Sequence, residues 1–149
     1  MKNLTRAILA AAVVVSSVPA MAQFQKPEDA AKYRQGSFTV MAAHFGRLGA
    51  MASGKAPYDA KLAQDNAAIV EFMSKLPWAG FTADSQSVKS KAKPEVWMDK
   101  AKFDQGAEKM MTEVAKLNVA AKAGNLDALK AAFGETAKTC KACHDAFRE

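Results

Sequence analysis

The sequence predicts an all-α protein, an antiparallel four-helix bundle with one longer crossover loop. Strand signals are missing after residue 22, because no stretch alternates apolar and polar residues and no Asn-Gly or Asp-Gly hairpin turn occurs. The same stretch is rich in Ala, Lys, Met, Leu and Glu, which favour helices. Four segments within it repeat apolar residues at steps of three and four, which is the helical period.

The first helix is predicted to open at residues 26–29, where Pro27 takes a first-turn position and two acidic residues suit the helix N-terminus. It ends at Ser53-Gly54, and its apolar face runs through Phe38, Met41, Phe45, Leu48 and Met51. The second helix starts near residues 57–59 and stops at Pro77. Its apolar face is predicted to carry Leu62, Ile69, Phe72, Met73 and Leu76.

Residues 77–93 form the least regular stretch and are predicted to be the crossover loop, with at most a short turn of helix. Loops of this length are uncommon in compact domains and often belong to a functional site. The loop ends in a tight basic cluster of Lys89, Lys91 and Lys93. The simpler interpretation of this cluster is a solvated loop, and the alternative is a docking patch for a redox partner protein.

The third helix is predicted to begin at Pro94-Glu95 and to carry Val96, Phe103, Met110, Val114 and Leu117. Gly124-Asn125 then supplies a helix stop followed by a new N-cap. The fourth helix continues almost to residue 149, and its repeating positions are Leu126, Leu129, Phe133, Ala137, Cys140, His144 and Phe147. The two cysteines and the histidine therefore continue the apolar stripe of this helix.

Residues 1–22 have the form of a cleaved export signal. Lys2 and Arg6 make a basic head, residues 7–15 are an unbroken apolar run, and Ala20-Met21-Ala22 fits a cleavage site. The run is too short to cross a bilayer, whose core needs about 20 residues. A core helix or a retained anchor is the alternative interpretation. We expect a mature domain of residues 23–149 in the periplasm, with no insertion into the membrane.

Composition excludes several classes of protein. A chain of 149 residues suits one domain, and an apolar half excludes disorder. Two cysteines are too few for a disulfide scaffold. Loss of the two basic signal residues would lower the net charge from +6 to +4. This charge is too small for the dense basic surface that a nucleic-acid-binding protein needs.

The strongest signal is the run Cys140-Lys141-Ala142-Cys143-His144, the Cys-x-x-Cys-His attachment motif of c-type haem. Two thiols three residues apart share one face of a helix, so both can add to the vinyl groups of one porphyrin. The adjacent imidazole can then bind the iron. Export agrees with this prediction, because c-type haem is attached outside the bacterial cytoplasm.

Three other interpretations of the motif are weaker. A thioredoxin-like dithiol expects a βαβ context, which the sequence lacks. A zinc site needs a fourth ligand, and His44 would be the candidate. A structural disulfide between the cysteines does not explain the histidine that follows them.

The chain resembles the cytochrome c′ family of four-helix proteins, in its betaproteobacterial form. The likeness covers residues 23–149 and rests on Lys32-Tyr33-Arg34-Gln35, His44-Phe45-Gly46-Arg47, Leu76-Pro77-Trp78-Ala79, Pro94-Glu95-Val96-Trp97 and the motif itself. The resemblance implies one covalent haem c, with thioether bonds to Cys140 and Cys143 and with His144 as the proximal iron ligand. It further implies a propionate contact for Arg34 and Gln35, a cover over the distal iron face from Phe38, a place in the proximal pocket for Arg148, and haem-edge contacts for Lys91 and Ala92.

The sixth coordination position decides between two functions. Phe38 follows Arg34 by one helical turn and cannot bind iron, so a vacant, apolar distal side would admit NO and also CO. Met41, on the same helix, is the rival ligand, although packing in the core is its simpler role. A methionine–iron bond would instead favour a one-electron carrier between respiratory partners.

Two further expectations concern catalysis and assembly. We find no acid–base constellation near the motif, so the protein is not expected to be an enzyme. A homodimer through the first two helices is expected, because Val40 and Leu48 lie off the core face beside Gly46 and Gly49.

Overall fold

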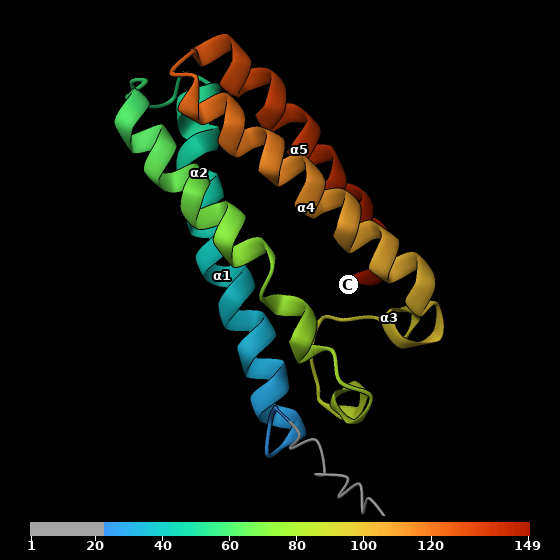
Figure 1. Cartoon of the computed structure of the whole chain (residues 1–149). Helices are drawn as coiled ribbons and strands as arrows, with labels where there is room; N and C mark the ends of the chain where they lie inside the picture. Colours follow the sequence, from blue (N-terminus) through green and yellow to red (C-terminus); the bar gives the residue numbers. More distant parts are fainter. Residues whose placement is uncertain (1–22) are drawn as a thin grey trace, which may run out of the picture.

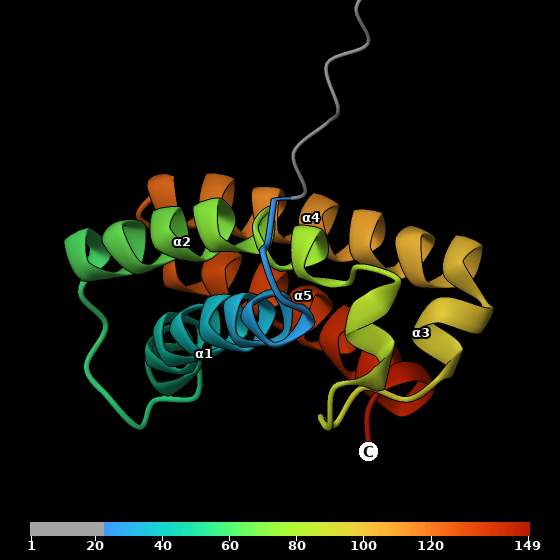
Figure 2. The same ribbon diagram turned by 90° about the horizontal axis from the view of Figure 1, so that it is seen from below.

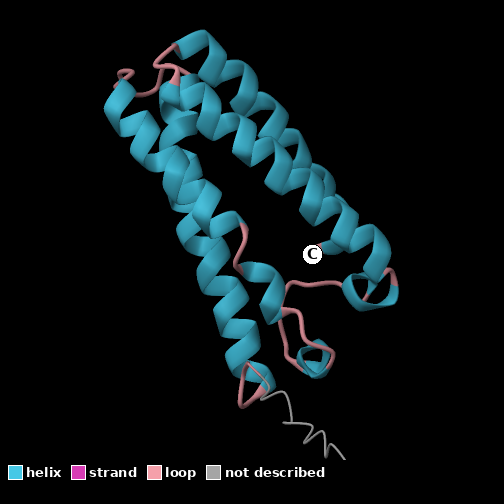
Figure 3. Ribbon diagram, viewed as in Figure 1, coloured by secondary structure: helices cyan, strands magenta, loops and turns pink. Residues whose placement is uncertain are grey.

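A computed structural model describes residues 23–149. The predicted export signal, residues 1–22, lies outside the described residues. The described chain is helical, with loops between the helices and no strand (Figure 3). Its elements are α1 (Pro27–Ala52), α2 (Ala60–Ser74), the 3₁₀ turns η1 (Pro77–Gly80) and η2 (Asp84–Ser87), α3 (Glu95–Met98), α4 (Lys100–Lys122) and α5 (Leu126–Phe147).

The four long helices form the predicted antiparallel bundle. α1 packs on α2, α2 on α4, α4 on α5, and α5 on α1 (Figures 1 and 2). At one end of the bundle, short loops join α1 to α2 and α4 to α5 (Figure 1). At the other end the two helix pairs diverge, and the crossover with α3 lies across that end (Figure 1). The prediction of a bundle with one longer crossover is confirmed.

The closed end of the bundle contains the main core. Large side chains there are fully buried, which removes their apolar surface from water and stabilises the fold. They come from all four long helices and include Leu48, Val70, Val114, Leu117 and Leu129. A second, smaller core of Val96, Phe103 and Phe147 joins α3, α4 and the end of α5.

The prediction for the apolar face of α2 is wrong for its larger residues. Leu62, Ile69 and Phe72 are exposed, and 65% of the Phe72 surface is accessible. The face that packs on α1 and α4 instead carries Ala63, Asn66, Ala67, Val70 and Ser74. Small side chains allow close helix packing, so the large apolar ones lie off the contact line.

One other helix differs from expectation. The third helix is broken at Asp99, whose carboxylate accepts a hydrogen bond from the Lys102 backbone N–H and caps α4. This cap separates the single turn of α3 from α4. No helix of the described residues is long and apolar enough to span a bilayer.

The residues predicted to support a dimer are only partly on the surface. Leu48 is fully buried in the core, so its predicted place off the core face is wrong. Gly49 lies under the Phe133 ring, and a Cβ atom there would come within 2.8 Å of it. Val40 is exposed, and Gly46 faces open space.

Candidate haem site

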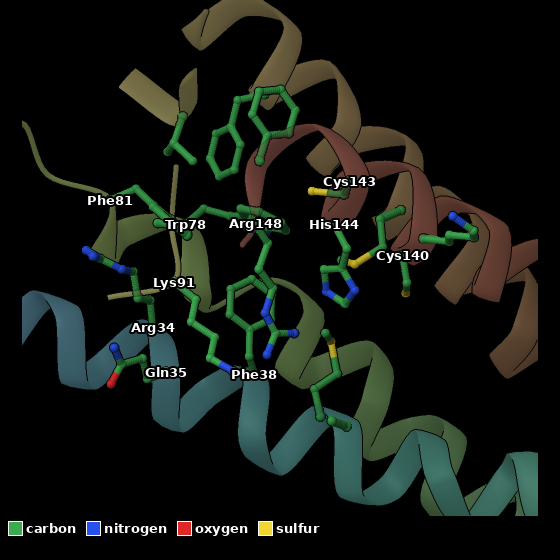
Figure 4. A pocket seen from close by; sticks show the side chains of 18 of the residues that line it. Arg34, Gln35, Phe38, Trp78, Phe81, Lys91, Cys140, Cys143, His144 and Arg148 are labelled. Carbon is green, nitrogen blue, oxygen red and sulfur yellow. The ribbon is translucent and has the colours of Figure 1, made fainter. Parts of the chain in front are cut away.

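A cavity of about 1200 Å³ lies where the two helix pairs diverge. It exceeds the roughly 300–1,000 Å³ of ordinary ligand sites, so it has room for a large, flat cofactor. Residues of α1, α4, α5 and the crossover line it. Aromatic rings form much of the wall, and the charged side chains of Arg34, Lys91 and Arg148 also line it (Figure 4).

The last two turns of α5 bring the motif to this cavity. Cys140, Cys143 and His144 all line it, as one helix face requires (Figure 4). Both thiols are free and part-buried. Burial raises the pKa of each thiol, and the neighbouring Cys140 adds to the effect at Cys143. A redox-active dithiol has a lowered thiol pKa, so the raised values argue against a thioredoxin-like pair.

The surroundings of His144 favour the neutral form of its imidazole. Burial lowers its pKa below the ordinary value, and the Arg148 cation lowers it further, while Asp145 acts in the opposite direction. A neutral ring keeps a nitrogen lone pair available at neutral pH, which is what a metal ligand needs. Because this pKa is lowered, the pH must fall further than for an ordinary histidine before a proton competes with a metal for that nitrogen.

Arg34 on α1 is a buried cation that donates only to neutral groups among the described residues. Only 2% of its surface is accessible. One guanidinium nitrogen donates to the Gly80 carbonyl at 2.6 Å and to the Ser85 hydroxyl at 2.7 Å. The same group lies 4.8 Å from the centre of the Phe81 ring. Burial lowers the pKa of Arg34, and an unpaired buried charge is costly.

These features fit haem c. The cavity offers two thiols and a neutral imidazole on one helix face, and it offers a buried cation that has no carboxylate partner within residues 23–149. A cofactor that bears carboxylates would supply this anion. Gln35, next to Arg34, also lines the cavity. The propionate contacts of both residues stay predictions.

Phe38 is fixed by other aromatic rings. Its ring packs edge-on against Trp78, with centroids 5.7 Å apart, and lies 6.4 Å from Phe81. The indole N–H of Trp78 donates to the Ser74 carbonyl, so it has no hydrogen bond left for a ligand. The wall around Phe38 is therefore apolar, and it faces the motif across the cavity (Figure 4).

The remaining predicted residues also line the cavity. Arg148 follows α5, while Lys91 and Ala92 belong to the crossover. Arg148 and Ala92 pair through an isolated antiparallel bridge. Sequence reasoning missed this bridge, because two single residues far apart in the chain carry no pairing signal.

Other members of the site had weaker sequence signals. Trp78 and Phe81 lie within the predicted crossover loop, and their rings support Phe38. Their place in a long loop was the signal available. Ser85, which accepts the Arg34 hydrogen bond, had no signal, because an isolated serine fits any polar loop.

His44 lies outside the cavity lining. Its Nδ1 is 2.8 Å from the Asn66 side-chain oxygen, on the seam between α1 and α2. No group of three or more metal-binding side chains occurs within residues 23–149. The zinc interpretation that used His44 therefore has no structural support.

Comparison with known proteins gives a consistent result. Residues 29–148 match the family model described as Cytochrome C'. The chain is similar to the cytochrome c′ of Rubrivivax gelatinosus, with 51% identity over 128 residues, which cover 85% of this chain and 99% of that protein. It is also similar to the cytochrome c′ of Alcaligenes xylosoxydans xylosoxydans, with 47% identity over 127 residues, 85% of this chain and 98% of that one.

Solved structures agree with the sequence matches. The crystal structure of the Rubrivivax gelatinosus protein superposes with a TM-score of 0.83 at 51% identity and covers 85% of this chain and 100% of that one. A ferrous variant of the Alcaligenes xylosoxidans cytochrome c prime with bound NO gives a TM-score of 0.80 at 46% identity, with the same coverage.

Proposed function

The chain belongs to the cytochrome c′ family and so carries covalently bound haem c, and from this premise we propose that it is a periplasmic NO-binding protein. In this proposal, Cys140 and Cys143 form the thioether bonds and His144 is the only protein ligand of the iron. Phe38 covers the distal side, which leaves a five-coordinate, high-spin iron. NO binds there, and so does CO. The haem supplies the metal, and the chain decides which ligands reach it.

The apolar wall around Phe38 is the observation that carries this proposal. Phe38 has no ligand atom, and the Trp78 N–H beside it is already bonded within the chain. Bound dioxygen would find no donor from these rings, and water or an anion would lose its solvation without a partner. Neutral diatomic molecules lose little solvation free energy when they enter a cavity with such a wall. The site should therefore select NO and CO over dioxygen, water and anions.

The other side of the site supports a second step for NO. Arg148 lines the cavity one helical turn after His144, and its N–H donates to the His144 carbonyl at 3.0 Å. We propose that Arg148 would control access to this proximal side of a bound haem, where NO would take the place of His144. A variant of a 46% identical relative with bound NO supports NO as the ligand.

A second function is favoured by Met41. Its side chain is buried and lines the same cavity as Phe38. A thioether that reached the iron would make a low-spin, six-coordinate electron carrier. In that case Lys89 and Lys91, which line the cavity and are exposed, would mark the docking side for a redox partner.

Spectra of the purified holoprotein decide between these functions. We expect high-spin optical and EPR signals and a shift of the Soret band when CO is added to the reduced protein. The physical reason is that a single axial nitrogen leaves the iron in a weak ligand field. A methionine–iron charge-transfer band with no CO response would contradict the proposal and support the electron carrier.

Periplasmic location and the non-enzymatic role are parts of the same proposal. Covalent haem attachment outside the cytoplasm requires export, and residues 1–22 have the form of an export signal. Ligand binding at the proposed iron site needs no acid–base group. We therefore propose a gas sink or carrier that does not catalyse a reaction.

We also propose a homodimer through α1 and α2. Leu62 and Ile69 are exposed seven residues apart on α2, and Asn66 between them bonds to His44 of α1. Val40 is exposed one turn before His44. These exposed apolar side chains therefore lie beside the line of contact between α1 and α2. The same surface on a second copy of the chain could pair with it in a dimer of two-fold symmetry.

Sedimentation of the holoprotein should show a dimer at micromolar concentration, and Ile69→Glu should shift it to the monomer. The reason is that an unpaired carboxylate would have to be buried in the contact. Met98→Glu is the matched control, because Met98 is exposed on α3, away from the seam. A monomeric wild-type protein would contradict this assembly.

A further inference from the structure

Residues 147–149, which we call the strap, leave α5 and run beside the crossover. The backbone of Arg148 is extended, with φ −133° and ψ 138°, so the helix has ended. Arg148 pairs with Ala92 in an antiparallel bridge. The strap therefore connects the helix that carries the motif to the loop that supports the opposite wall of the cavity.

Two backbone hydrogen bonds hold the strap on either side of this pair. The Lys93 N–H donates to the Phe147 carbonyl, and the Glu149 N–H donates to the Lys91 carbonyl, each at 2.9 Å. In this pattern the two residues between the bonds face each other closely, with their side chains on one side of the ribbon. Both Ala92 and Arg148 accordingly line the cavity.

Lys93 makes a further contact with the end of α5. Its ammonium group donates to the Asp145 carbonyl at 3.0 Å. The last carbonyls of a helix have no partner within the helix, and a cation is favourable beside them. Lys93 therefore satisfies two such carbonyls, those of Asp145 and Phe147, in the turn that carries His144.

The strap also fixes where Arg148 points. Phe147 is buried against Phe103, with ring centroids 5.3 Å apart, and so anchors one side of Arg148. The bond from Glu149 to the crossover anchors the other side. Between these anchors, the Arg148 side chain reaches into the cavity beside His144 (Figure 4).

From this geometry we infer that Lys93 is a positioning residue for gas binding: through the strap it holds Arg148 over the proximal side and limits how fast NO replaces His144. Lys93 itself touches no ligand. The inference rests on the proposed function, in which NO reaches that side. In the proposed function Phe38 on α1 governs distal binding of CO, and Phe38 takes part in none of the strap hydrogen bonds.

Three variants of Lys93 test the inference in the holoprotein. Lys93→Pro removes both the N–H and the ammonium, Lys93→Met removes only the ammonium, and Lys93→Arg keeps a cation. Lys100→Met is the matched control, because Lys100 lies at the start of α4, outside the cavity lining, and bonds to Asp104 on its own helix. The readouts are hydrogen exchange of the Glu149 amide, the rate at which the NO complex loses its His144 bond, and the CO association rate.

We expect Lys93→Pro to raise two rates by about tenfold each: hydrogen exchange of the Glu149 amide, and loss of the His144 bond from the NO complex. A tenfold change corresponds to about 1.4 kcal/mol in the free energy of opening the strap. Lys93→Met should lie between this variant and the wild type, and Lys93→Arg and Lys100→Met should match the wild type. The CO association rate should not change. Protein that folds with its haem but shows wild-type exchange in Lys93→Pro would overturn the role of Lys93.

The two proposals fail in different ways. Faster exchange with an unchanged NO conversion rate would overturn this inference and leave NO binding intact. A wild-type protein that forms no NO complex at all would overturn the proposed function and this inference together. If Lys93→Pro does not fold, the ordering of Lys93→Met and Lys93→Arg decides the question by the same readouts.

Discussion

Replacing Phe38 by alanine should speed CO association by about a hundredfold, which corresponds to a barrier lower by about 2.7 kcal/mol. The warrant is steric, because the ring slows ligands by occupying the volume they need. Phe38 is held in place by Trp78 and Phe81, so it does not swing aside without disturbing other rings. Stopped-flow mixing of the reduced holoprotein with CO measures the rate. NO should also remain on the distal side in this variant, with the His144 bond intact.

Two other variants make this prediction specific. Phe38→Met places a thioether in the same volume, where it is able to bind iron and should convert the spectrum to low spin. Phe133→Ala is the matched control, because Phe133 is an aromatic residue that stacks on Phe45 in the closed end of the bundle. It should leave CO association unchanged. An unchanged rate in Phe38→Ala would mean that another residue guards the iron, and Met41 would be the first to test.

Removing both thiols, as Cys140→Ala with Cys143→Ala, should abolish covalent haem attachment completely. The wild-type protein should keep its colour when it is extracted with acidified acetone, because thioether bonds survive this treatment. In the double variant the haem should pass into the organic phase. Cys143→Ala alone should leave a single thioether and a lower yield of holoprotein.

The control for this experiment is Lys141→Ala. Lys141 lies between the two thiols, is exposed, and pairs with Asp145 on the same helix, so its loss should leave attachment unchanged. Haem that leaves the wild-type protein in acetone would refute the thioether assignment. Haem that stays covalently bound in the double variant would show that the attachment uses other residues.

The local signals in the sequence located the helices well. Pro27 at the start of α1, Asn125 before α5 and Gly124 between the last two helices mark boundaries that the structure reproduces. Such signals act within one turn of the chain, so a single sequence contains them in full. The motif is of the same kind, because its spacing alone places two thiols on one helix face.

Packing between helices was less predictable. The exposed Phe72 and the buried Asn66 of α2 reverse what hydrophobicity alone predicts. Asn66 is satisfied by His44 and by the Leu62 carbonyl, and these partners become apparent only when α1 lies beside α2. The choice of buried face depends on how closely two helices approach, and that distance is a property of the pair.

The sequence by itself determined an all-helical chain, the residues of the Cys140–His144 motif and the neighbouring positions of Arg34 and Phe38 on α1. The tertiary structure alone decided that Arg34 is buried against Gly80 and that Arg148 is held by a bridge to Ala92. The physical reason is range. Helical periodicity and caps depend on residues a few positions apart, whereas these contacts join segments separated by some fifty residues, and only the folded bundle brings them together.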